Sequence, residues 1–384
     1  FWLKYQWTLG CCDHHIFLRP RRFLVRAAMT TLTETISTPI TKMFNIKHPI
    51  ILAGMNVAAG PELAAAVTNN GGLGVIGGVG YTPKMLQVNI DEIKANLNDK
   101  NAPFGVDLLL PKVGEGARKT NYDYTHGHLP ELIDIIISSG CKLFVAAVGT
   151  PPKWVVDKLH AAGIPVMNMI GAPKHAQYCI DAGVDIICAQ GGEGGGHTGD
   201  VATSILIPKV VDICKGHKSP LTGDPIQVVA AGGIFDGRGV AMALSLGASA
   251  VWVGTRFVAS VEAGAPKRHK DGVVKAGYHD TQRTIIYTGR PMRCILSPYI
   301  REWEDKQQEI KTLTSKGIIP VTHDLEKRKK EGKEDMLVSQ WQPLLSGQAA
   351  GAISDIKPAA EIITEMVTGA IESLRTSTAL ISRL

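Results

Sequence analysis

The chain has 384 residues, of which 45% are hydrophobic and 20% are charged, and its formal net charge is +6 at pH 7. This is an ordinary globular composition, long enough for one large barrel domain or two smaller domains. It shows neither a basic stripe interleaved with aromatic residues nor an apolar run of membrane-spanning length, so we expect no nucleic-acid or membrane partner.

Residues 1–28 differ from the rest of the chain because they are rich in arginine and aromatic residues and nearly free of acids. Either they form an organelle-targeting leader, or they lie upstream of a true start at Met29. The CCDHH stretch and the scarcity of serine favour the second interpretation, and we expect no ordered structure here. The seven cysteines are scattered without a CxxC pair, which indicates reduced thiols and a cytoplasmic location, or a mitochondrial one if the leader is real.

Eight short apolar runs follow, and a helix-like stretch separates each from the next. They are continuously apolar rather than alternating, as expected of strands that are buried on both faces. The runs are 49–55, 73–78, 104–110, 142–149, 165–170, 184–191, 226–233 and 249–255. Eight β–α units predict an α/β fold, a (β/α)8 TIM barrel over residues 40–255. A doubly wound sheet is the runner-up, although it would rarely need eight evenly spaced units.

The pattern changes after Thr255. Residues 256–345 are more charged and contain helix-like stretches such as 301–313, which predicts a small helical cap, inserted after strand eight, that selects the substrate. Residues 346–384 include apolar positions at helical spacing over 358–374, so we expect a C-terminal helix that returns to the barrel.

The sixth run leads into AQGGEGGGHTGD, residues 189–200, where six glycines surround Glu193 and His197. Glycine loses the most conformational freedom on folding, so either a ligand lies against bare backbone here or the segment is a loose loop. A lone histidine is usually structural, but this loop offers little packing to satisfy one, and imidazole titrates near neutrality. We therefore predict a catalytic role for His197. Glu193 could orient His197, contact the ligand or cap the next helix.

The seventh and eighth runs each end in a pair of residues that contains glycine, at the place where such barrels commonly bind phosphate. Gly232 and Gly233 end one run, and Gly254 and Thr255 end the other. Backbone N–H groups free of side-chain crowding form an anion site. Tight turns are the alternative interpretation, but the two pairs at the two expected strands favour a phosphate site.

Two more residues are expected at the barrel mouth. Met55 ends the first run and could pad a flat ring or simply fill the core. Asp107 interrupts the apolar third run, and a carboxylate there is costly unless it has a polar partner. We expect no metal, because His126 and His128 have no acidic or cysteine neighbours and are better placed on a surface loop. No dinucleotide fingerprint or GxSxG motif is present.

Together these motifs resemble the nitronate monooxygenase family, formerly called 2-nitropropane dioxygenases, from about Phe44 to the C-terminus. The motifs are AQGGEGGGHTG (189–199), AAGGI (230–234), VGTRF (253–257), TGRPMR (288–293) and SGQAAGAI (346–353). The resemblance implies a (β/α)8 barrel that binds FMN non-covalently. It also implies that the catalytic histidine is His197. With the residues already singled out at the barrel mouth, the expected cofactor-binding residues are Met55, Asp107, Gln190, Gly195, Gly232, Gly233, Trp252, Val253, Gly254 and Thr255.

The chain departs from the family pattern at two positions. Asp107 stands where the family usually has asparagine near the flavin, and Gly54 stands where Ala-Pro is common. A carboxylate near the ring would disfavour the anionic reduced flavin, or would itself be protonated. Both departures bear on substrate choice and redox tuning.

The resemblance implies FMN-dependent oxidation of alkyl nitronates, or of nitroalkanes, by O₂ to carbonyl compounds and nitrite. The alternative is an NAD(P)H-dependent flavin reductase of quinones or enoyl thioesters, and a third interpretation is a flavin-binding protein without catalysis. The expected partners are the nitronate and O₂, with a homodimer left open.

Overall fold

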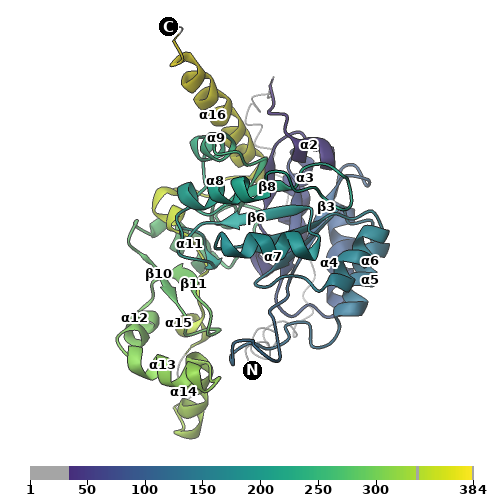
Figure 1. Cartoon of the computed structure of the whole chain (residues 1–384). Helices are drawn as coiled ribbons and strands as arrows, with labels where there is room; N and C mark the ends of the chain where they lie inside the picture. The colour runs from purple at the N-terminus through teal and green to yellow at the C-terminus, as the bar shows by residue number, and fades with distance from the viewer. Residues whose placement is uncertain (1–33, 334–336, 383–384) are drawn as a thin grey trace, which may run out of the picture.

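The computed structural model describes residues 34–333 and 337–382, so the predicted leader or upstream extension at 1–28 lies outside the described residues. Its centre is a sheet of eight parallel strands (Figure 1). They are β1 (Ile50–Leu52), β2 (Gly74–Gly78), β3 (Phe104–Leu109), β4 (Leu143–Ala147), β5 (Val166–Ile170), β6 (Ile186–Gln190), β8 (Gln227–Ala231) and β9 (Ala250–Val253).

The sheet closes into a barrel. Its strands are hydrogen-bonded in the order β1-β9-β8-β6-β5-β4-β3-β2. The two ends of this order are joined by hydrogen bonds between β1 and Leu73, the residue just before β2. Leu52 N donates to Leu73 O, and Leu73 N donates to Ile50 O, each at 2.9 Å. Every strand coincides with one of the eight apolar runs. The predicted (β/α)8 barrel is therefore confirmed, and the doubly wound sheet is wrong because a doubly wound sheet has two free edges.

Helices cover the outside of the barrel. They are α3 (Pro61–Asn69), α4 (Pro83–Asn96), α5 (Leu129–Ser138), α6 (Lys153–Ala161), α7 (Lys174–Ala182), α8 (Thr203–Cys214), α9 (Gly237–Ser245), α10 (Thr255–Val258) and α16 (Ala359–Ala379), with the 3-10 turns η1 (Asn56–Ala59) and η2 (Gln348–Ala352). Local capping sets several starts: the Thr82 hydroxyl accepts from Met85 N before α4, and the Asp236 carboxylate accepts from Gly239 N before α9.

Alternate strand residues face two different cores. Val251 and Val253 pack outward against the helices, whereas Ala250 and Trp252 point into the barrel. A short helix, α2 (Pro39–Phe44), adds its buried apolar side chains to the inner core and so closes the amino-terminal end of the barrel. The carboxyl ends of the strands form the opposite, open end.

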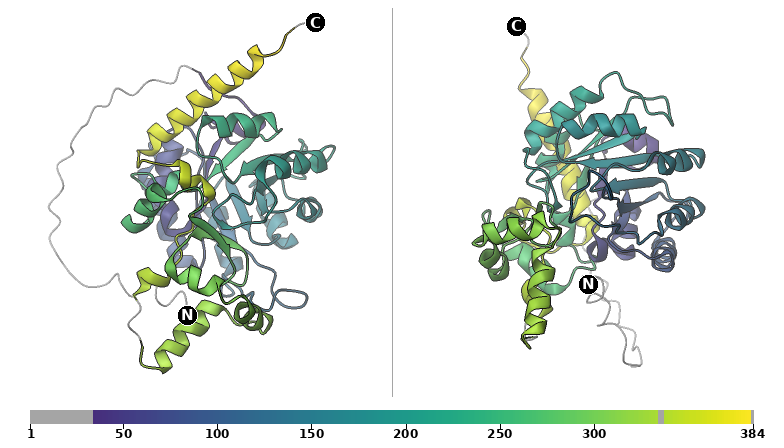
Figure 2. Two further views of the ribbon diagram at one scale, coloured as in Figure 1. Left: turned by 90° about the vertical axis from the view of Figure 1, so that its left-hand side faces the viewer. Right: turned by 60° about the horizontal axis from the view of Figure 1, so that its bottom comes forward.

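The last helix, α16, lies against α9 on the outside of the barrel, as the two views of Figure 2 agree. Glycines allow the close approach. A Cβ atom on Gly237 would lie 2.4 Å from the backbone of Gly369 and Ala370. Any side chain at Gly237 would push the two helices apart, because real Cβ atoms essentially never come so near to backbone.

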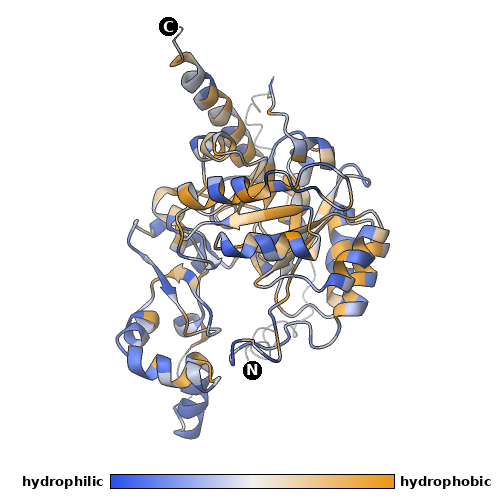
Figure 3. Cartoon of the chain, viewed as in Figure 1, coloured by the Kyte–Doolittle hydropathy of each residue, from blue (hydrophilic) through white to orange (hydrophobic). Residues whose placement is uncertain are grey.

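The segment predicted as a helical cap contains helices but also two strands. Its elements are α11 (Lys267–Lys275), β10 (Thr281–Thr284), β11 (Met292–Ile295), α12 (Pro298–Glu304), α13 (Gln307–Ser315), α14 (Pro320–Lys330) and α15 (Val338–Trp341). It buries an apolar cluster of its own around Tyr287, Trp303 and Trp341, while its outer helices are hydrophilic in Figure 3. The strand content was not expected, because β10 is polar and lacks an apolar run.

A second small sheet joins the cap to the barrel. It has the order β10-β11-β7, and β7 (Gly196–His197) lies in the glycine-rich segment after β6. Met292 pairs with His197, and Arg293 pairs with Gly196, both in antiparallel register. No helix within the described residues is both long and apolar enough to cross a membrane.

Candidate active site

A large cavity opens at the carboxyl ends of the barrel strands. Its volume is about 1450 Å³, and residues at or just after the end of every barrel strand line it, with the cap forming the far wall. Nine of the ten predicted cofactor residues, and His197, lie along it. Val253 does not, because its side chain is fully buried on the outer face of β9. The cavity therefore brings together all the predicted site residues except Val253.

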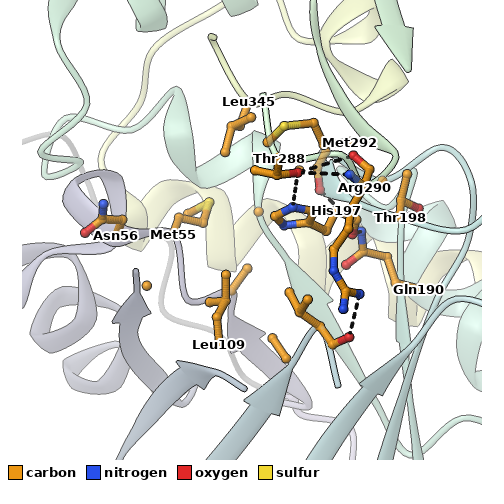
Figure 4. Close-up of a pocket in the computed structure, with 18 of the residues that line it drawn as sticks. Met55, Asn56, Leu109, Gln190, His197, Thr198, Thr288, Arg290, Met292 and Leu345 are labelled. Atoms are coloured by element: carbon orange, nitrogen blue, oxygen red, sulfur yellow. Dashed lines mark hydrogen bonds between the residues drawn. The ribbon is translucent and has the colours of Figure 1, made fainter. Parts of the chain in front are cut away.

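His197 is held at the mouth by the cap. Its backbone pairs with Met292 of β11, and its Nε2 lies 3.0 Å from the hydroxyl oxygen of Thr288. Figure 4 shows the imidazole pointing toward the space that Met55 and Leu109 border. The expectation of a loop with little packing around the histidine was wrong, because a strand almost a hundred residues later supports it.

The Thr288 hydroxyl sets the tautomer of the imidazole. Besides Nε2 of His197, its oxygen is contacted by Arg290 N at 3.3 Å and lies 3.4 Å from Arg290 O. A hydroxyl has one proton to donate and two lone pairs to accept. All three contacts are satisfied when Thr288 donates to Arg290 O and accepts from the other two. This arrangement puts the ring proton on Nε2 and leaves Nδ1 of His197 as a proton acceptor.

Arg290 provides positive charge beside His197. Burial, and then this guanidinium, lower the pKa of His197 to about 4, so the imidazole is neutral throughout the physiological range. Arg290 Nε donates to Asn121 Oδ1 at 3.0 Å, and its NH1 donates to Val148 O at 3.0 Å. Val148 has a φ of 72°, which is strained for a β-branched residue. Such strain is typical of functional sites, and here it aims a carbonyl at the guanidinium.

Most glycines of the 189–200 segment serve backbone packing. A Cβ atom would lie 1.9 Å from Gly171 O if placed on Gly199, and 2.7 Å from Gly347 N if placed on Gly195. The close neighbours of these glycines are thus other parts of the chain. Glu193 accepts from the backbone and hydroxyl of Thr203 at 3.0–3.1 Å, so it caps α8, the third of its predicted alternatives.

The residue pairs just after β8 and β9 present free backbone donors to the cavity. The N–H groups of Gly232, Gly233, Gly254 and Thr255 have no hydrogen-bond acceptor in the parts of the chain that the structure describes. Gly232 and Gly233 have φ values of 94° and 74°, which favour glycine. Unpaired N–H groups gathered at one place form an anion site of the kind that holds a phosphate.

Three further predicted residues line the cavity between these groups. Gln190 points inward from the end of β6, and its Nε2 donates to His197 O at 2.9 Å and to Gly195 O at 3.3 Å. It therefore also orients the segment that carries the histidine. The sulfur of Met55 would lie 3.4 Å from a Cβ on Gly254, which places it against the predicted phosphate end. Trp252, with 5% exposure, closes the barrel interior beneath them.

Asp107 lies deep in the barrel on the inner face of β3. It is 2% exposed, and its Oδ1 has no hydrogen-bond partner among the described residues. Burial raises its pKa to about 8, so the group is largely protonated at neutral pH. The polar partner that the sequence led us to expect is thus missing for this oxygen, although the side chain borders the cavity.

Two functional candidates escaped the sequence analysis. Arg290 and Thr288 both lie in the TGRPMR motif, which we noted without assigning any role to its residues. The available signal was that this motif is one of the five that carry the family resemblance. Only the antiparallel pairing of β11 with β7 brings them to His197.

The model of the family described as nitronate monooxygenase matches residues 37–369. The chain belongs to the nitronate monooxygenase family. Membership makes it a flavin oxidoreductase.

Individual relatives of this family member differ in activity. It is 32% identical to the Mycobacterium tuberculosis (3aS,4S,5R,7aS)-5-hydroxy-7a-methyl-1-oxo-octahydro-1H-indene-4-carboxyl-CoA dehydrogenase, over 90% of this chain and 99% of that protein. The solved structure of FabK from Thermotoga maritima is 31% identical, with a TM-score of 0.74, over 90% of this chain and all of that one. A nitroalkane oxidase from Streptomyces ansochromogenes is 25% identical, with a TM-score of 0.71, over 88% and 99% of the two chains.

The cavity has the features that a flavin mononucleotide needs. Unpaired N–H groups at Gly232 and Gly254 fit a terminal phosphate, and the carboxyl group of Asp107 borders the cavity where a polar ring edge could meet it. The volume of about 1450 Å³ exceeds the roughly 300–1,000 Å³ of ordinary ligand pockets, so a cofactor would leave room for a substrate.

Proposed function

We propose that this flavin oxidoreductase uses FMN and oxidises alkyl nitronates, or the nitroalkanes from which they form, with O₂ to give carbonyl compounds and nitrite. The observation that carries the proposal is the neutral imidazole of His197, fixed at the cavity beside the guanidinium of Arg290. The family match and the similarity to a nitroalkane oxidase support it. When bound, FMN would accept the electrons of the substrate and pass them to O₂.

The protein groups supply a proton acceptor and a positive charge. Nδ1 of His197 takes the proton from the carbon next to the nitro group, while Thr288 holds the ring through Nε2. Removal of the proton leaves a nitronate anion, whose charge Arg290 stabilises. That anion also favours the imidazolium that forms, which offsets the low pKa of the unliganded histidine. Asn121 and Val148 keep the guanidinium in place.

A second candidate function is the oxidation or reduction of a thioester on a long anionic carrier. The cavity is larger than FMN and a small nitronate need, and basic side chains outnumber acids along it. The cations are Arg118, Lys174, Arg268, Arg283 and Arg290, against the acids Asp107 and Asp200. The dehydrogenase relative is named for a CoA derivative, which supports this candidate. An NAD(P)H-dependent reductase would belong to this class.

One set of measurements separates these functions. The purified chain is examined by visible absorption, and then receives propionate 3-nitronate or NADH in separate samples. Oxygen uptake and nitrite release with the nitronate, without NADH, are the expected results. Rapid anaerobic bleaching by NADH, with no response to the nitronate, would instead support the thioester reductase. A yellow protein inert to both donors would be a flavin-binding protein without either activity.

A further inference from the structure

Asp107 is a buried group that the proposed chemistry does not use. Its carboxyl lies on the inner face of β3, is 2% exposed and borders the cavity. The described part of the chain offers no partner to its Oδ1. Buried polar atoms are nearly always hydrogen-bonded, so an unpaired atom on a side chain that borders a cavity points to a ligand there.

The surrounding backbone is shaped to admit this side chain. A Cβ atom on Gly54 would lie 2.6 Å from Oδ2 of Asp107, and one on Gly77 would lie 2.4 Å from its Cβ. The chain is therefore bare at both places that face the carboxyl, one just after β1 and one on β2. Gly54 and Asp107 are also the two positions that depart from the family pattern, and the structure brings them into contact. An alanine at 54 would collide with the side chain at 107.

Among the described residues, no charged group compensates the carboxylate form of Asp107. Asp107 pairs in register with Gly77 and Val145, neither of which titrates. The titratable groups that it influences are Tyr81, ahead of α4, and Cys188 on β6. Burial and the nearby acid raise the pKa of both, so they are neutral as well. Burial alone raises the pKa of Asp107 to about 8, which keeps its proton in place at neutral pH.

We propose that Asp107 binds the flavin as a neutral carboxylic acid, donating a hydrogen bond from its carboxyl group to an acceptor atom of the bound ring. This role rests on the proposed FMN-dependent function. Flavin carbonyl oxygens and unprotonated ring nitrogens accept hydrogen bonds, whereas a carboxylate has no proton to give and repels them. Asparagine would donate in the same place at every pH. The acid therefore makes cofactor binding sensitive to pH, and asparagine would not.

The test measures the dissociation constant of FMN, by quenching of its fluorescence, at pH 6 and pH 9. The full-length chain is stripped of flavin and compared with Asp107→Asn and Asp107→Ala. If only the neutral acid binds, wild-type binding of FMN is about tenfold weaker at pH 9 than at pH 6, because pH 9 is one unit above the pKa of Asp107. Asp107→Asn changes by less than about twofold, since it keeps a donor that does not titrate. Asp107→Ala binds about fivefold more weakly than Asp107→Asn at pH 6.

Each other outcome overturns the proposal. The same pH dependence in Asp107→Asn would assign it to another group, including ionisation of FMN itself. Equal binding by Asp107→Ala and Asp107→Asn at pH 6 would show that no hydrogen bond is made. A wild-type chain that binds no FMN at pH 6 would remove the FMN-dependent function, and the role of Asp107 with it. Tight binding with no pH dependence would keep that function and reject only the neutral acid.

Discussion

Replacing Asp107 with asparagine should change the free energy of unfolding in a way that depends on pH. Burial raises the pKa of this acid from 3.8 in the unfolded chain to about 8 in the folded one. The folded state therefore keeps a proton that the unfolded state loses between these values. Because the folded state prefers the neutral acid, stability is greatest below pH 3.8 and falls as pH rises through the window up to about pH 8.

The slope follows from linkage. Each pH unit inside the window costs about 1.4 kcal/mol, so the buried acid destabilises the fold by roughly 4 kcal/mol at pH 7 relative to pH 3.8. Asp107→Asn removes this term. Its stability relative to wild type should therefore rise by about 1.4 kcal/mol per pH unit between pH 4.5 and 7. An unpaired buried amide could impose a cost of about 1–3 kcal/mol, but that cost does not depend on pH, so the slope is the diagnostic quantity.

Urea unfolding of the flavin-free proteins at pH 4.5, 5.5 and 7 measures the difference. Asp305→Asn is the matched control, because Asp305 is exposed and the same substitution there should leave the difference from wild type nearly constant. Parallel curves for wild type and Asp107→Asn would refute the reasoning, since they would mean that the carboxyl is already ionised in the folded state.

Three further predictions concern the histidine and its loop. His197→Asn should lower kcat/KM for a neutral nitroalkane by about 10²–10⁴-fold but that for preformed nitronate by only about 2- to 10-fold, in oxygen-uptake assays. The control His175→Asn, at another histidine along the cavity, should leave both kcat/KM values unchanged. Equal losses with the nitroalkane and the nitronate in His197→Asn would remove the role of His197 as base. Thr288→Val should lower nitroalkane turnover and Thr288→Ser restore it, because only serine keeps the acceptor for Nε2; equal rates in both variants would contradict the tautomer assignment. Gly199→Ala should lower the free energy of unfolding by about 1–3 kcal/mol or more, because its Cβ would overlap Gly171 O, and an unchanged urea midpoint would count against that packing.

Local patterns in the sequence were sufficient to predict the barrel. Continuous apolar runs and intervening helical stretches repeat eight times, and each run became a strand because burial on both faces demands apolar side chains at every position. The same reasoning located the ligand end, since the carboxyl ends of the strands carry the glycine pairs. Gly232 and Gly254 therefore lie along the cavity as predicted, although their contacts with a phosphate remain a proposal.

The partners of individual residues depend on contacts between distant segments, which local patterns do not contain. His197 pairs with Met292, and Thr288 and Arg290 reach it from the same cap segment, about 90 residues further along the chain. The glycines of 189–200 appeared to serve a ligand, yet several allow other backbone to pack against them. The sequence by itself determined which elements form and which end of the barrel binds, because burial and periodicity act locally. Only the tertiary structure decided that the histidine is neutral and that the acid on β3 has an unpaired oxygen, because desolvation and hydrogen-bond pairing depend on what every other segment places beside them.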